Sequence, residues 1–215
     1  MTTSVVVFGR EPVVGKVKRR LARGLGADAA ARIYAAVLDH TLHTVSGCGV
    51  PCFLSLAEVP SEKWKKPDGF SLEIQVSGDL GDRMAATFAR RFREGARRVV
   101  LLGSDCPWVV ATHVHAAIAF LEDSEVVIGP ATDGGYWLVA QRAPGVDLFT
   151  GVPWSSPGTL DRTRKRLAAL GVAWTEIEEL RDIDTASDLE AVLNDPRTPE
   201  GLRNQFVKML NSAGI

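Results

Sequence analysis

Apolar residues along this chain alternate between two spacings, which predict strands and helices in turn. Short apolar runs that end at charged or turn residues predict strands. The predicted strands cover residues 4–8, 52–56, 71–76, 98–103, 126–129, 137–141 and 172–177. Apolar residues three and four positions apart predict helices around 33–45, 84–92, 112–121, 160–170, 186–193 and 200–211.

Local signals support several of these boundaries. Thr112 is placed to cap the helix over 112–121. Thr185 and Asp188 have capping-box spacing at the start of the helix over 186–193, which makes Asp188 structural.

Alternating strands and helices predict one α/β domain over residues 1–215, a three-layer α/β/α sandwich around a mostly parallel sheet. The continuous apolar run at 98–103 is typical of a strand covered on both faces, so we expect it at the centre. An excursion at the sheet edge around 130–141 would make the sheet mixed.

Composition narrows the class of protein. A chain of 215 residues that is 46% hydrophobic and 24% charged is an ordinary globular protein. The formal net charge of −1, without a basic helix interleaved with aromatics, argues against nucleic-acid binding. The sequence predicts neither a membrane span nor a secretory signal, so we expect a cytoplasmic protein with no membrane partner.

The three cysteines predict packed, reduced thiols. Their odd number argues against a disulfide framework, and Cys48 and Cys52 lack the second ligand pair of a zinc site. Cys106 has no histidine in a recognisable partner motif and is not expected to be a nucleophile.

A glycine-containing basic loop directly follows the first predicted strand. Its six cations are Arg10, Lys16, Lys18, Arg19, Arg20 and Arg23, with Glu11 as the one acid among them. Such cations repel one another unless an anion is near, and ligands sit beyond the carboxyl ends of strands. The loop therefore favours a phosphate site, with a solvated cationic turn as the alternative.

This loop is not a Walker A motif. Gly9 and Gly15 are separated by five residues rather than four, and Val17 stands where Ser or Thr must hold magnesium.

An aspartate follows the strand over 98–103. Asp105 should face the same edge as the basic loop, and Pro107 prevents a helix from continuing there. A carboxylate beside a polyphosphate favours a bridging divalent cation, so Asp105 is predicted to bind Mg²⁺ or Mn²⁺. A simple Asx turn at the strand end is the alternative.

A third polar segment follows the strand over 126–129. Gly134 and Gly135 would let backbone approach a ligand, Asp133 could accept from sugar hydroxyls, and Tyr136 could wall a pocket. A tight turn followed by edge-strand aromatics explains the same residues without function.

Near the C-terminus, Asp182 and Asp184 are candidates for a second metal ligand if the last strand returns to the sheet centre. They are otherwise solvated loop acids. His113 and His115 stand two residues apart on a helix and cannot share a metal.

Taken in order from Val5 to Leu189, the motifs resemble the DUF2064 family of the GT-A, nucleotide-diphospho-sugar transferase superfamily, related to 2-phospholactate and molybdenum-cofactor guanylyltransferases. The opening motif K-x-P-x-x-G-x-x-K-T-R-L corresponds to residues 10–21, with Arg10 for Lys and Arg19 for Thr. The later matches are Gly78–Met84, Gly103–Pro107, Gly129–Ala131, Asp133–Tyr136 and Trp154–Ser155.

The resemblance implies the GT-A fold, a nucleotide site at the N-terminal loop and a metal on Asp105. The expected nucleotide-binding residues are Gly9, Arg10, Gly15, Lys18, Arg20, Gly78, Asp79, Arg83 and Ser104. The expected acceptor-binding residues are Asp133, Gly134, Gly135, Tyr136 and Trp154, and Asp105 and Asp184 are the expected metal ligands.

We therefore expect a Mg²⁺- or Mn²⁺-dependent transferase that takes a nucleotide or nucleotide sugar and a small acceptor. The expected catalytic residues are Lys18, Arg20, Asp105 and Asp133. Glycosyl transfer would release a nucleoside diphosphate, whereas nucleotidyl transfer would release pyrophosphate. A nucleotide-binding module without catalysis is the remaining alternative.

Overall fold

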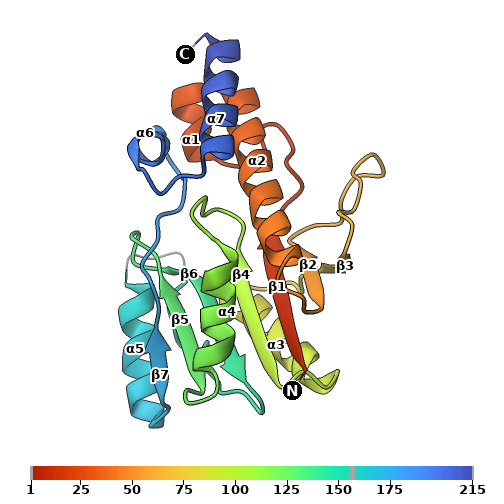
Figure 1. The fold of residues 1–215 in the computed structure, drawn as a ribbon. Helices are drawn as coiled ribbons and strands as arrows, with labels where there is room; N and C mark the ends of the chain where they lie inside the picture. Colours follow the sequence, from red (N-terminus) through yellow and green to blue (C-terminus); the bar gives the residue numbers. More distant parts are fainter. Residues whose placement is uncertain (1, 155–157, 215) are drawn as a thin grey trace.

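The computed structural model describes residues 2–154 and 158–214. Seven strands form one sheet in the order β3-β2-β1-β4-β6-β5-β7 (Figure 1). The strands are β1 (Thr3–Gly9), β2 (Cys52–Leu56), β3 (Phe70–Ile74), β4 (Arg98–Gly103), β5 (Val126–Pro130), β6 (Tyr136–Arg142) and β7 (Trp174–Glu176). The helices are α1 (Arg19–Leu25), α2 (Ala27–Ser46), α3 (Leu80–Arg93), α4 (Ala111–Phe120), α5 (Thr159–Leu170), α6 (Ala186–Asn194) and α7 (Glu200–Ala213).

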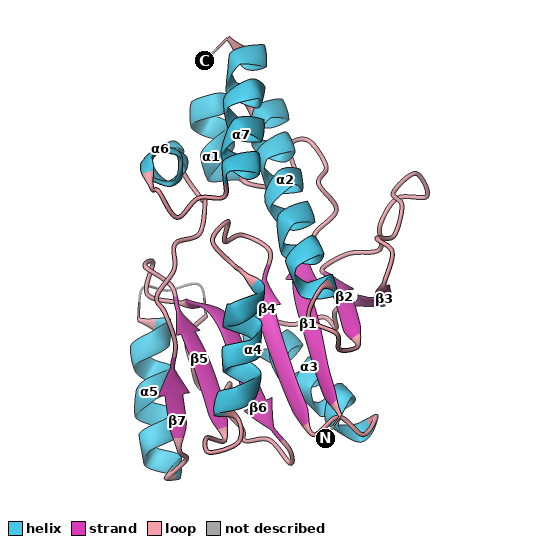
Figure 2. Cartoon of the chain, viewed as in Figure 1, coloured by secondary structure: helices cyan, strands magenta, loops and turns pink. Residues whose placement is uncertain are grey.

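Helices cover both faces of the sheet, which confirms the three-layer α/β/α prediction (Figure 2). Val5 and Val7 of β1 face a core shared with α1, α2, α4, α6 and α7. Val6 and Phe8 face the opposite core, which α3 and α5 close. This division follows from the alternation of side chains along a strand.

Strand β4 lies at the centre of the sheet, as its continuous apolar run predicts. Strand β1 pairs in parallel with β2 and with β4, and β2 pairs in parallel with β3. Strands β5 and β7 also pair in parallel. Strand β6 runs antiparallel to both β4 and β5.

The sheet is mixed, as predicted, but the expectation that the excursion lies at its edge is wrong, because β6 lies inside the sheet. Residues 131–135 form a hairpin connection that is too short for a crossover, so β6 must run antiparallel beside β5. Its central residues are buried, as a strand covered on both faces requires.

The basic loop predicted from the sequence is a loop only in its first part. Its second part forms α1, which the sequence analysis did not predict, so Arg19, Arg20 and Arg23 lie on a helix. The fully buried side chain of Leu21 anchors this helix to the core. In Figure 1, α1, α2 and α7 gather beyond the carboxyl ends of β1 and β4.

Other local predictions have mixed outcomes. Thr112 is not a cap, because α4 begins at Ala111 after Val110. The capping box of Thr185 and Asp188 is present at α6. All three cysteines are free and buried, as predicted. No helix in the described part of the chain is long and apolar enough to cross a bilayer.

Candidate active site

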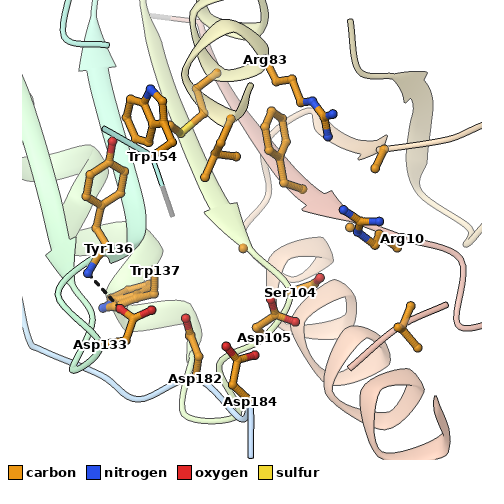
Figure 3. Close-up of a pocket in the computed structure, with 18 of the residues that line it drawn as sticks. Arg10, Arg83, Ser104, Asp105, Asp133, Tyr136, Trp137, Trp154, Asp182 and Asp184 are labelled. Atoms are coloured by element: carbon orange, nitrogen blue, oxygen red, sulfur yellow. Dashed lines mark hydrogen bonds between the residues drawn. The ribbon is translucent and has the colours of Figure 1, made fainter. Parts of the chain in front are cut away.

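A cavity of about 980 Å³ opens at the carboxyl ends of β1 and β4 and extends along β6. Basic residues from the β1 loop and α1 line the cavity together with carboxylates. Figure 3 shows four of these carboxylates, Asp105, Asp133, Asp182 and Asp184, and the basic side chains of Arg10 and Arg83. Apolar side chains of Phe8, Met84 and Leu101 form part of its wall. Carboxyl ends of parallel strands are the usual ligand-binding edge of an open α/β sheet.

Most of the predicted nucleotide-binding residues line this cavity. They are Gly9, Arg10, Lys18, Arg20, Arg83 and Ser104, and Lys16 and Arg19 join them. Gly15, Gly78 and Asp79 are not among the lining residues that the structure describes.

The three predicted nucleotide-binding residues that do not line the cavity support the segments around it. Gly15 has a φ of 79° and supports a turn in which Lys16 N donates to Val13 O at 3.0 Å. Asp79 caps α3 by accepting from the amide of Asp82 at 2.9 Å. Gly78 O accepts from Arg83 Nε at 3.1 Å, so this motif orients Arg83.

Lys18 joins the basic loop to two distant carboxylates. Its Nζ lies 2.9 Å from Asp105 Oδ1 and 2.8 Å from Asp184 Oδ1, and its side chain is only 9% exposed. Burial alone would lower the pKa of Lys18, but the charges and hydrogen bonds of Asp105 and Asp184 outweigh it and raise that pKa. Lys18 is therefore a charged, buried ammonium group at neutral pH.

The backbone at Lys18 is unusual. Within residues 2–154 and 158–214, Lys18 is the one non-glycine residue with a positive φ, at 46°. This left-handed conformation places Lys18 as the N-cap of α1. Such strain costs about 1–2 kcal/mol for an L-residue and persists where surrounding contacts enforce it.

Backbone hydrogen bonds bring the C-terminal acids to the cavity. Ile183 N donates to Asp105 O at 3.0 Å, and Leu180 N donates to Pro130 O at 3.0 Å. The segment after β7 therefore returns to the sheet centre, which is the condition under which Asp182 and Asp184 become candidate ligands. Both line the cavity.

Asp182 adds a third carboxylate beside Asp105 and Asp184 (Figure 3). Burial, followed by the negative charge of Asp105, raises the pKa of Asp182 to about 8, although Lys18 opposes this shift. Asp182 therefore keeps its proton at pH values well above those at which an aspartic acid usually loses it.

Asp105 and Asp184 suit a hard divalent cation, because carboxylate oxygens are the ligands that Mg²⁺ prefers. The Lys18 ammonium between them shows that this position attracts a cation. Among the residues that the structure describes, no cluster of three or more acid, histidine or cysteine side chains is arranged to hold a metal alone. Two carboxylates with substrate phosphates are a common Mg²⁺ environment, so the residues fit a metal that arrives with a nucleotide.

Tyr34 was not singled out from the sequence, yet it links two loops of the site. Its hydroxyl accepts from Arg10 N at 2.8 Å and lies 3.0 Å from Ser104 Oγ. Burial, then the nearby charge of Asp105, raises the pKa of Tyr34. Its place among apolar residues on α2 makes it look like an ordinary core residue in the sequence.

Four of the five predicted acceptor residues lie in the wall of the cavity. Asp133, Gly135, Tyr136 and Trp154 line it, and Tyr136 and Trp154 meet edge to face with ring centroids 6.2 Å apart. Ser155 lies outside the described residues.

The alternative of a structural turn also holds for this segment. Asp133 Oδ1 accepts from Gly135 N at 2.9 Å in an Asx turn. Gly134 is not among the described lining residues; it has a φ of 88°, and its carbonyl accepts from Leu160 N at 2.9 Å. A valine at 134 would strain this turn, so it would not be a selective probe of acceptor binding.

The structure resembles solved transferases. A provisionally named nucleotide-diphospho-sugar transferase from Desulfovibrio desulfuricans G20 shares 25% identity and a TM-score of 0.90 over 99% of each chain. The inositol-1-phosphate CTP transferase of T. maritima shares 12% identity and a TM-score of 0.57, with 97% of this chain and 96% of that chain covered.

Rv0371c from Mycobacterium tuberculosis H37Rv, solved as a complex with manganese, shares 18% identity and a TM-score of 0.52. The match covers 89% of this chain and 97% of that chain. No curated protein matches the sequence.

The fold and the likeness to the Desulfovibrio desulfuricans protein support an enzyme of the transferase class. Residues 46–156 match DUF2064, a family of uncharacterized proteins conserved in bacteria, and the chain belongs to this family. The alternative of a binding module without catalysis is therefore set aside.

Proposed function

We propose that the protein transfers a nucleoside monophosphate from a nucleoside triphosphate to a small phosphorylated acceptor and releases pyrophosphate. The observation that carries this proposal is the surplus of cations on one side of the cavity. Arg10, Lys16 and Arg19 line it, and none of them forms an ion pair with another described residue. With Arg20 beside them, they match the charge of a triphosphate better than that of a diphosphate.

In this reaction, an oxygen of the acceptor phosphate attacks the α-phosphorus of the triphosphate. The bond between the α-phosphorus and the bridging oxygen breaks, and pyrophosphate leaves with that electron pair. Lys18 and Arg20 would hold the phosphates and stabilise the charge that develops on the leaving group.

Asp105 and Asp184 would hold Mg²⁺ or Mn²⁺, which neutralises phosphate charge when bound. The complex of Rv0371c with manganese supports the use of a divalent metal in this fold. Asp133, Gly135, Tyr136 and Trp154 would form the acceptor side, since they line the same cavity. Free nucleotides are the proposed donors, which agrees with the expected cytoplasmic location.

Glycosyl transfer from a nucleotide sugar is the second candidate. The name of the Desulfovibrio desulfuricans protein and the position of Asp133 in the cavity favour it. Asp133 would then bind or deprotonate an acceptor hydroxyl, and a nucleoside diphosphate would leave.

Product analysis separates the two reactions. The protein is incubated with each nucleoside triphosphate or nucleotide sugar, with Mg²⁺ or Mn²⁺ and a panel of sugar phosphates and alcohols. We expect pyrophosphate from a nucleoside triphosphate and none from the Asp105→Asn variant. Release of nucleoside diphosphate from a nucleotide sugar would instead establish glycosyl transfer.

A further inference from the structure

We infer that Lys18 is a built-in counter-ion that occupies the place of the divalent metal in the nucleotide-free enzyme and leaves it when metal and nucleotide bind together. This inference rests on the proposed function, because it assigns Asp105 and Asp184 to the metal. Lys18 Nζ is 2.9 Å from the Asp105 carboxylate and 2.8 Å from that of Asp184, so it already satisfies the two predicted ligands.

The ammonium and a divalent ion cannot share this position. Mg²⁺ binds carboxylate oxygens at about 2.0–2.1 Å, which would place the ion within the gap that Lys18 Nζ fills. Two cations so close in a partly buried site repel strongly. A metal that arrives alone must therefore expel a paired, buried ammonium group without offering it another partner.

A polyphosphate offers that partner. Lys18 lies on the same cavity wall as Arg20, whose Nη1 is 3.6 Å from Asp184 Oδ2 and whose side chain is 68% exposed. Phosphate oxygens beside Arg20 would be within reach of the four-carbon Lys18 side chain. Lys18 can then leave the two carboxylates and pair with phosphate oxygens. The metal can in turn give up water ligands and bind the two carboxylates.

The exchange makes metal and nucleotide binding mutually dependent. Without nucleotide, Lys18 opposes the metal; without metal, Asp105 and Asp184 hold Lys18 away from the phosphates and repel them. The enzyme would therefore bind the metal complex of a nucleotide in preference to either component. By linkage, each component raises the affinity for the other.

The test is the affinity of the nucleotide-free protein for Mn²⁺, measured by calorimetry and by the electron paramagnetic resonance signal of free Mn²⁺. Lys18→Met removes the ammonium and keeps the side-chain length. Arg20→Met removes the same formal charge from the same cavity but not from between the two carboxylates. We expect Lys18→Met to bind Mn²⁺ about tenfold more tightly than the wild type, and Arg20→Met to change the affinity by about twofold or less.

Equal effects of the two variants on Mn²⁺ affinity would contradict the inference, because Lys18 would then act only as one of several positive charges in the cavity. An unchanged or weaker affinity in Lys18→Met would also overturn it. If Lys18→Met does not fold in metal-free buffer, we expect Mn²⁺ to restore folding, measured by circular dichroism, and failure to do so counts against the inference.

These outcomes are distinct from failure of the proposed function. An unchanged Mn²⁺ affinity in Lys18→Met, with pyrophosphate still released by the wild type, rejects the exchange and leaves nucleotidyl transfer intact. Tighter Mn²⁺ binding in Lys18→Met, with nucleoside diphosphate as the product, supports the exchange and rejects nucleotidyl transfer.

Discussion

The ammonium group of Lys18 lies 2.8 Å from Asp184, across 166 residues of sequence. This contact ties the loop after β1 to the segment that follows β7, and it places opposite charges in the lining of the cavity. It also separates the roles of the basic residues. Lys18 is held by carboxylates, whereas Arg10, Lys16 and Arg19 form no ion pair with another described residue.

Asp105→Asn should keep the fold and lose metal-dependent nucleotide binding. Asp184 still pairs with Lys18 in this variant, and the Asp105 side chain is 41% exposed, so stability should change little. Calorimetry with Mn²⁺ and a nucleoside triphosphate measures the loss. The same affinity in both proteins would remove Asp105 from the metal site.

Arg20→Ala should weaken nucleotide binding by about 1.5–3 kcal/mol, the range for hydrogen bonds to charged groups. Its melting temperature should not fall, because the Arg20 side chain is 68% exposed. Arg32→Ala is the control, since Arg32 is a half-exposed arginine of α2 that does not line the cavity. A loss of stability in Arg20→Ala, with affinity intact, would make α1 a purely structural element.

Lys18→Ala should lower both the affinity for nucleotide and the stability of the protein. In the structure, removal of Lys18 leaves Asp105 and Asp184 close together without their shared cation. The two carboxylates then repel each other with no cation between them, so thermal unfolding at neutral pH should report a lower melting temperature.

Asp182→Asn should flatten the dependence of stability on pH. Because the pKa of Asp182 is raised to about 8, the native state retains a proton that the unfolded chain loses near pH 4. The contribution of Asp182 is therefore fully present at about pH 4 and is lost as pH rises towards 8. In metal-free buffer, the melting temperature of Asp182→Asn relative to the wild type should rise across this window, and parallel curves would contradict the assignment.

Gly81→Ala should disturb the acceptor side through Trp154. The indole of Trp154 packs directly on Gly81 in the first turn of α3, where an added Cβ would overlap the ring. Gly201 occupies the matching position of α7 with open space around it. Gly201→Ala should therefore stabilise the protein by up to about 1 kcal/mol, as helix propensity predicts.

Gly81→Ala should instead lower the melting temperature and raise the acceptor KM. Equal stabilisation by the two substitutions would show that Trp154 moves without cost and does not shape the cavity.

The sequence was enough to predict the layers and the central strand, because periodicity reports which faces are buried. It was not enough to place β6 inside the sheet, since pairing partners depend on the hairpin with β5. It also missed α1, whose seven residues give little helical periodicity.

The site shows the same division. Asp105 and the basic loop could be predicted because each follows a strand whose carboxyl end reaches the ligand-binding edge. Tyr34 could not, because its role depends on a hydroxyl contact with Ser104 that joins two distant loops. Likewise, the ion pair between Lys18 and Asp184 arises only when the chain after β7 returns to the sheet centre.

We expect nucleotide phosphates and a metal to meet between Asp105, Asp184 and the basic loop. A crystal structure with Mn²⁺ and the nucleoside triphosphate that most raises the melting temperature tests it directly, through the anomalous signal of manganese. We predict a manganese peak between the carboxylates of Asp105 and Asp184, with Lys18 and Arg20 on the phosphates. A manganese peak elsewhere, or a nucleotide bound away from this cavity, would show that Asp105, Asp184 and the basic loop do not form the metal and nucleotide site.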